Sequence, residues 1–126
     1  MAEEKIVRWK VIDPRGIEIV MYDETFVDHV VGDHGEKDAK VRQSVEGNAK
    51  RTLQDPHFIM RDPAFKSRFQ YLRLDLIGVE GRMKKIKPIK VVIEQDEDSD
   101  GWKVVTWGAQ NRLQGQFTRE DVVYES

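Results

Sequence analysis

A helical apolar stripe that ends at a proline constrains the fold of this chain more than any other feature. Apolar side chains recur every four residues along one helix face, at Val41, Val45, Ala49 and Leu53. Asp38 is the expected N-cap of this helix. Pro56 disfavours helical backbone in the residue before it, so the helix must end before residue 56. The chain after Pro56 is then expected to supply a sheet on which the stripe packs.

Four runs after Pro56 are rich in β-branched and aromatic residues, and they are predicted to be strands: 57–61, 69–77, 89–94 and 102–107. The connections at 78–88 and 95–101 are predicted loops. Because the connections are too short for a crossover helix, the four strands are expected to be antiparallel. Nearer the N-terminus, Asp13-Pro14-Arg15-Gly16 has the composition of a tight turn between two strand-like runs, 6–12 and 17–22.

A short helix is expected from Thr25 to Gly32, because Thr25 and Asp28 resemble a capping box and apolar residues recur at helical spacing after them. The resulting fold is α+β: an N-terminal β-hairpin, two helices and a four-stranded antiparallel sheet with the helices on one face. Residues 1–126 suit a single domain. Residues 111–126 are predicted to be a polar tail with a short apolar patch at 122–124.

Composition excludes several classes of protein. The 126 residues contain no cysteine, so disulfides, thiol chemistry and cysteine-ligated metal sites are excluded. No apolar run approaches the roughly 18 residues of a membrane span, and the N-terminus lacks the pattern of a signal peptide. A cytoplasmic protein that does not enter a membrane is therefore expected. The net charge of −2 argues against indiscriminate binding of nucleic acid.

Two charged runs follow one another along the chain. Five basic residues lie between Arg82 and Lys90, and five acidic residues lie between Glu94 and Asp100. One interpretation is a pair of solvated loops that keep sheet edges soluble. The other is a local patch that attracts phosphate on a molecule whose other surfaces repel RNA.

Known catalytic and metal-binding motifs are absent or incomplete. The run 96–101 matches the first half of a calcium loop, but Trp107 occupies the position of its closing glutamate. His29 and His34 are five residues apart and lack the His-Glu-x-x-His arrangement of zinc hydrolases. There is no phosphate-binding glycine loop, nucleophile elbow or dinucleotide fingerprint. No metal and no cofactor are therefore expected.

Metal-independent cleavage of RNA is the chemistry that remains. RNA carries its own nucleophile, the 2′-hydroxyl, so an enzyme needs only a base, an acid and cations or hydrogen-bond donors around the phosphate. The chain offers side chains of these kinds at His29, His34, Lys50, Arg51, Tyr71, Arg73 and Thr106. Trp102 and Trp107 are candidates for stacking on bases, although packing in the core is the commoner role of tryptophan.

A family resemblance agrees with this chemistry. The chain carries Phe26-x-x-His29-Val30-x-x-x-His34-x-Glu36, then Thr52-Leu53-x-x-Pro56-x-x-Ile59-x-x-Asp62, Tyr71-Leu72, Lys90-Val91-Val92-Ile93 and Val104-Val105-Thr106. Over about residues 17–110 this pattern resembles phage members of the barnase, EndoU, colicin and RelE superfamily of nucleases. The resemblance implies N-terminal helices followed by a curved four-stranded sheet. It also implies a metal-independent endoribonuclease, commonly in a phage or toxin setting.

The resemblance implies a set of site residues. His29, His34 and Thr106 match the family's catalytic positions, and Arg51 lies in the basic stretch before Thr52. Substrate-binding roles are expected for Lys50, Tyr71, Arg73 and Lys90. RNA is the expected partner, and a toxin setting admits an inhibitor or antitoxin protein as well. The alternative is a non-catalytic phage or mobile-element protein that binds RNA or a protein partner through the same fold.

Overall fold

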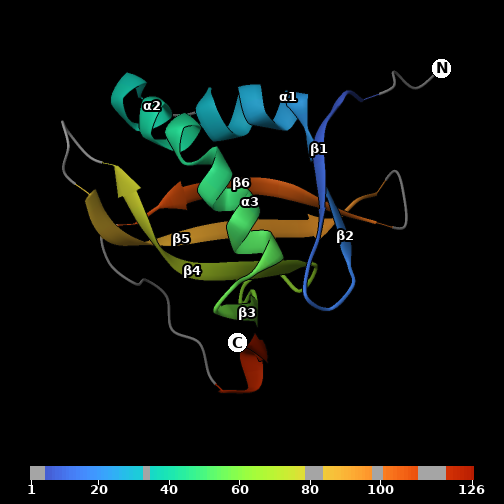
Figure 1. The fold of residues 1–126 in the computed structure, drawn as a ribbon. Coiled ribbons are helices and arrows are strands. Elements are labelled where there is room, and N and C mark those ends of the chain that lie inside the picture. The colour runs from blue at the N-terminus through green and yellow to red at the C-terminus, as the bar shows by residue number, and fades with distance from the viewer. Residues whose placement is uncertain (1–4, 33–34, 79–83, 98–100, 111–118) are drawn as a thin grey trace.

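The computed structural model describes residues 5–32, 35–78, 84–97, 101–110 and 119–126. A single sheet forms its centre, with strand order β1-β2-β6-β5-β4-β3-β7, and the helices cover one face of that sheet (Figure 1). The strands are β1 (Val7–Ile12), β2 (Glu18–Tyr22), β3 (Phe58–Arg61), β4 (Arg68–Gly78), β5 (Lys84–Gln95), β6 (Trp102–Ala109) and β7 (Val122–Glu125). The opposite face of the sheet, which we call the open face, carries no helix among these residues.

The helices are α1 (Asp23–Thr25), the π-helix η1 (Phe26–Val31), α2 (Glu36–Ser44), α3 (Glu46–Gln54) and the 3-10 turn η2 (Arg119–Asp121). The helix predicted from Asp38 to Pro56 is therefore two helices. Its break falls at Val45, where φ is −101° and ψ is 16°, outside the helical region. The break turns α3 away from α2 and across the sheet (Figure 1). Val45, Ala49 and Leu53 are buried as expected, whereas Val41 is exposed.

The predicted N-terminal hairpin is present, and its turn is fixed by Asp13. The carboxylate of Asp13 accepts hydrogen bonds from the backbone N–H groups of Arg15 (2.9 Å) and Ile17 (2.8 Å). Gly16 has φ of 84°, a left-handed conformation that glycine adopts without steric cost. Tyr71, from β4, donates a hydrogen bond of 2.6 Å to Asp13 Oδ2. The turn of the hairpin is thus bonded to the middle of the sheet.

The prediction of a four-stranded sheet is wrong, although the α+β class fits. The four expected strands are present as β3 to β6, but the sheet of the described residues has seven strands. The hairpin joins it because β2 pairs in parallel with β6 at Ile19↔Trp102 and Val20↔Lys103. On the other side, β7 pairs antiparallel with β3. Both additions pair strand edges that a four-stranded sheet would leave open.

One predicted loop also needs correction. The segment 78–88 was expected to be a loop, but from Lys84 onwards it is part of β5, which pairs with β4 from Lys84 to Glu94. The C-terminal segment was expected to be a polar tail with an apolar patch at 122–124, and this patch lies in β7. Much of the basic run therefore lies on a strand.

The core lies between the helices and the covered face of the sheet. Trp107 is almost fully buried there, and its ring centroid lies 6.1 Å from that of Trp9 and 5.7 Å from that of Phe26. Trp102 is partly buried and meets Phe69 edge to face. Both rings therefore take part in packing, the commoner role of tryptophan. Within the described residues, no helix combines the length and the apolar character that crossing a bilayer requires.

Candidate functional site

An open cavity of about 480 Å³ lies where β2 diverges from β6. Parallel pairing between these strands extends only to Lys103, so the edge of β6 beyond that residue faces α1 and η1. The volume falls within the range of roughly 300–1,000 Å³ usual for ligand sites. The cavity is lined by Lys5, Tyr22, Glu24, Thr25, His29, Arg68, Glu94, Lys103, Val104, Val105 and Thr106.

A row of charged side chains crosses three central strands at this cavity. In register, Arg68 on β4 is opposite Glu94 on β5, and Glu94 is opposite Lys103 on β6. Arg68 Nε lies 2.9 Å from Glu94 Oε2, and Lys103 Nζ lies 3.9 Å from Glu94 Oε1. Neighbouring residues on β5, Val91 and Ile93, point into the core. Strand alternation therefore places the row on the open face.

His29 reaches the same cavity from η1. Phe26 and Val30 of this π-helix are buried and fix it against the core, while His29 is exposed. Imidazole is a common general acid or base in enzymes, so His29 is a candidate for proton transfer with a ligand in this cavity.

Thr106 lies at the far end of the cavity, and its hydroxyl is oriented by Arg42. Arg42 Nη1 donates to Thr106 Oγ1 at 3.3 Å. Since the hydroxyl oxygen accepts this bond, its own proton remains available for another acceptor. A hydroxyl donor, an imidazole and the cations of the row therefore line one space.

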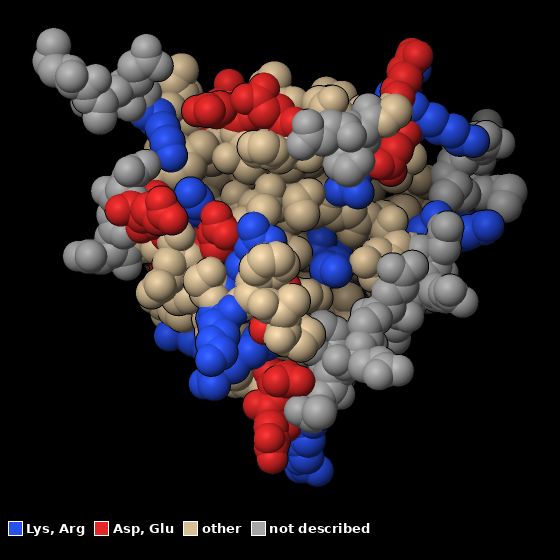
Figure 2. Space-filling model, turned by 180° about the vertical axis from the view of Figure 1, so that it is seen from behind, with Lys and Arg blue, Asp and Glu red and all other residues tan. Residues whose placement is uncertain are grey.

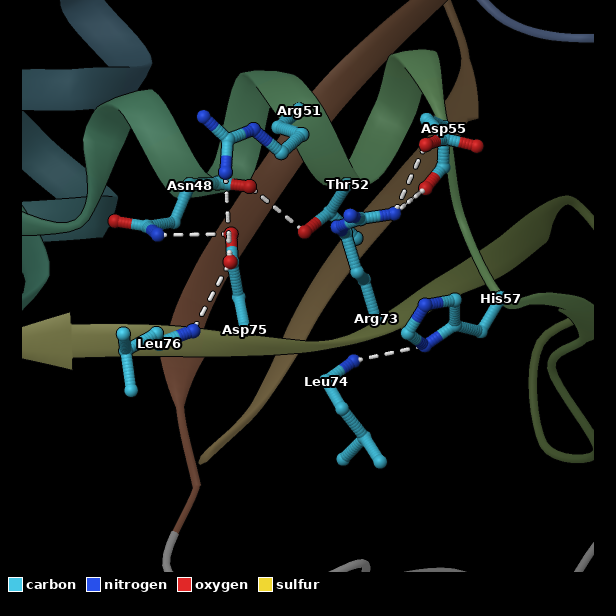
Figure 3. A network of polar contacts seen from close by, with 9 residues as sticks. All are labelled: Asn48, Arg51, Thr52, Asp55, His57, Arg73, Leu74, Asp75 and Leu76. Carbon is cyan, nitrogen blue, oxygen red and sulfur yellow. Dashed lines mark hydrogen bonds and ion pairs between the residues drawn. The ribbon is translucent and has the colours of Figure 1, made fainter. Parts of the chain in front are cut away.

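Of the two other predicted catalytic residues, only Arg51 can be compared with this group. His34 lies outside the described residues. Arg51, on α3, forms an ion pair of 3.5 Å with Asp75, which also accepts a hydrogen bond of 2.9 Å from Asn48 (Figure 3). The carboxylate of Asp75 is nearly buried, so its partners on α3 serve to attach the helix to β4. Arg51 is absent from the lining of the cavity.

Three of the four predicted substrate-binding residues have structural contacts on the helix side. Lys50 lies over the ring of Trp9, at 5.6 Å from its centroid. Arg73 Nη1 donates to the backbone carbonyl (2.6 Å) and the carboxylate (3.0 Å) of Asp55, which ties the end of α3 to β4 (Figure 3). Tyr71 is fully buried, and this burial, reinforced by its hydrogen bond to Asp13, raises the pKa of its hydroxyl well above the ordinary value.

Lys90, the fourth, lies on the open face. It lines a second, smaller cavity that also includes Thr106. Lysine and arginine side chains gather over the middle and one flank of the molecule as seen from behind Figure 1, with acidic side chains mostly nearer the rim (Figure 2). Of the predicted residues, the structure thus associates His29, Thr106 and Lys90 with cavities.

Sequence reasoning missed Arg68, Glu94, Lys103 and Arg42. The alternation of polar Lys90 and Glu94 with apolar Ile89, Val91 and Ile93 could have assigned Glu94 to the face away from the core. The register that brings Lys103 beside Glu94 depends on a β-bulge between Val92 and Ile93, which no local pattern reveals. Arg68 is placed beside Glu94 by the regular ladder between β4 and β5.

No cluster of three or more histidine or acidic residues suited to a metal ion occurs within the described part of the chain. The acidic loop is described only in part. Asp96 is buried and accepts a hydrogen bond of 2.6 Å from the hydroxyl of Tyr22, so its carboxylate helps to hold β2 at the cavity.

Comparisons with family models, curated proteins and solved structures find no match to this chain.

Proposed function

We propose that the protein is a metal-independent endoribonuclease whose active site is the 480 Å³ cavity. The observation that supports this best is the meeting of His29 with the Arg68–Glu94–Lys103 row in one space. Cleavage by the RNA's own 2′-hydroxyl needs an acid, a base and positive charge around the phosphorus. The lining of this cavity contains a group for each of these roles. An RNA substrate fits the expected cytoplasmic setting.

The proposed roles follow from charge and chemistry. Glu94 accepts the proton of the 2′-hydroxyl as O2′ attacks phosphorus. The bond from phosphorus to O5′ then breaks, and His29 in its protonated form gives a proton to O5′. Arg68, Lys103 and the Thr106 hydroxyl donate hydrogen bonds to the phosphate oxygens, where negative charge accumulates in the transition state. The products are a 2′,3′-cyclic phosphate and a 5′-hydroxyl, and no cofactor takes part.

The test is incubation of the full chain with single-stranded RNA in excess chelator. Cleavage that yields 2′,3′-cyclic phosphate ends, and that is lost in Glu94→Gln, is the expected result. Lys37→Gln is a matched control, because Lys37 is exposed on α2, away from both cavities. Cleavage that requires a divalent ion, or that survives in both Glu94→Gln and His29→Ala, would contradict the proposal.

A binding protein without catalysis is the second candidate, and one observation favours it. Glu94 already pairs with both cations of the row, and Glu24 adds a second carboxylate to the lining. The positive charge available to a phosphate is thereby reduced. Retention of an RNA that stays intact after prolonged incubation would support this candidate. A protein ligand, such as an inhibitor or antitoxin, would be expected to cover the same cavity.

A further inference from the structure

A second cavity, of about 140 Å³, shares Thr106 with the first. Its lining consists of Arg42, Lys90, Val92, Thr106, Trp107, Gly108, Ala109 and Gln110. The two cavities are adjacent because Thr106 lines both of them. The second differs in charge: its described lining contains two cations and no carboxylate.

Arg42 is held in place at this cavity by several bonds. Its Nε lies 3.1 Å from Asp38 Oδ2, one turn earlier on α2. Its Nη1 donates to Thr106 Oγ1 and to the backbone carbonyl of Trp107. In return, the indole Nε1 of Trp107 donates to the backbone carbonyl of Arg42 at 2.8 Å. A long side chain fixed in this way loses little further entropy when it binds a ligand.

Gly108 makes room for that guanidinium. A Cβ at this position would lie 3.3 Å from Arg42 Nη1, which is tighter than most real contacts. Lys90 is directly opposite Gly108 in the ladder between β5 and β6. Two cations from different elements, Arg42 and Lys90, therefore border the same short stretch of backbone.

We infer that the second cavity binds a neighbouring phosphate of a single-stranded RNA whose scissile phosphate lies in the first cavity. The inference takes its ligand from the proposed function. The cavity is smaller than typical ligand sites of roughly 300–1,000 Å³, so it suits a phosphate group better than a whole nucleotide. A paired guanidinium and ammonium are the usual protein groups for a phosphate. Arg42 also contacts Thr106, so it connects the two subsites through one hydroxyl.

The test measures binding without cleavage. The probes are fluorescent 2′-O-methyl oligonucleotides, which lack the attacking hydroxyl: a dinucleotide with one phosphate, and a pentanucleotide. Each is titrated against the parent, Lys90→Gln and the control Lys37→Gln over a range of salt concentrations. Each phosphate contact with a single strand contributes about 0.7 to the slope of log affinity against log salt. Lys90→Gln is expected to lower the slope for the pentanucleotide by about 0.7, which is about fivefold in affinity at roughly 0.1 M salt.

The dinucleotide and the control separate the outcomes. The inference predicts that Lys90→Gln leaves binding of the dinucleotide unchanged and that Lys37→Gln changes neither probe. The inference would be overturned if Lys90→Gln lost equal affinity for both probes or lost affinity for neither. It would also be overturned if the parent did not bind the pentanucleotide. Arg42→Gln should also lower the slope for the pentanucleotide, and because Arg42 orients Thr106 it should weaken binding of the dinucleotide as well. Its melting temperature shows whether α2 stays attached. If the parent binds the pentanucleotide with this pattern but does not cleave ordinary RNA, the proposed catalysis fails while the subsite stands.

Discussion

Charged side chains have different roles on the two faces of the sheet. On the helix-covered face, Arg51 and Arg73 are paired with acidic groups, and these pairs attach α3 to β4 (Figure 3). On the open face, the row of Arg68, Glu94 and Lys103 borders a cavity with room for a ligand. Most polar groups under the helices are hydrogen-bonded within the protein, with Arg73 Nε as an exception, whereas a polar group beside an open cavity can exchange partners with a ligand. The face on which a residue lies therefore separates the candidates for function from those that hold the fold.

The largest effect is expected from removing the imidazole at the cavity. His29→Ala should lower the rate of RNA cleavage by about 10²-fold or more, because loss of a general acid or base typically has this effect. Since His29 is exposed, the melting temperature should stay close to that of the parent. Single-turnover kinetics and a thermal melt on the same preparation provide the check. A variant with full activity would remove His29 from the mechanism.

Tyr71→Phe should lower the stability of the protein and leave cleavage unchanged, as the distinction between the two faces predicts. The change removes the hydrogen bonds of the hydroxyl with Asp13 and Arg15 beneath the helices. It should cost about 2 kcal/mol of unfolding free energy, since a buried carboxylate loses a donor. Urea denaturation measures this cost, with cleavage per folded molecule as the second readout. A large loss of cleavage at unchanged stability would instead assign Tyr71 to the site.

Because the pKa of Tyr71 is raised, the stability of the folded protein should depend on pH in the alkaline range. The folded protein holds the hydroxyl proton more tightly than the unfolded chain, whose value is near 10.0. The stabilisation that the protonated Tyr71 hydroxyl contributes to the fold is therefore fully present below about pH 10. It declines as the pH rises above that value towards the pKa of Tyr71 in the folded protein. Denaturation at a series of pH values should show a shallower alkaline decline for Tyr71→Phe than for the parent. Parallel curves would contradict the assignment.

Thr106→Val should have an intermediate effect. The substitution keeps the shape of the side chain but removes the hydroxyl that Arg42 orients. Loss of one hydrogen bond to a charged group, worth about 1.5 kcal/mol, should lower kcat/KM by about tenfold. The measurement is steady-state cleavage of a pentanucleotide. No change would show that this hydroxyl does not contact the phosphate.

The smallest effect is expected at Arg51, although the family resemblance implied a catalytic role for it. Arg51→Ala should change cleavage by less than about twofold and stability by less than about 1 kcal/mol, because the Arg51 side chain is largely exposed and Asp75 keeps its hydrogen bond from Asn48. A loss of cleavage comparable to that of His29→Ala would reverse the distinction between the faces.

Local patterns predicted much of the fold but little of the site. The turn at Asp13–Gly16, the end of the helix before Pro56 and the four strands after it depend on residues close in sequence, and each was recognised. The parallel pairing of β2 with β6 and the addition of β7 to β3 join segments about 80 and 65 residues apart in sequence, so no local signal marks them. The row at the cavity depends on the exact register of β4, β5 and β6, and the bulge between Val92 and Ile93 shifts part of that register. Arg73 and Tyr71 were chosen for their chemistry, although they alternate with Leu72 towards the covered side of β4.

The most direct test of the distinction between the faces is amide and side-chain NMR of the protein titrated with a non-cleavable 2′-O-methyl pentanucleotide. The account predicts saturable shifts at His29, Arg68, Lys103 and Thr106, with little change at Lys50, Arg51 and Arg73. Shifts concentrated at the second group, with the cavity residues unchanged, would contradict it.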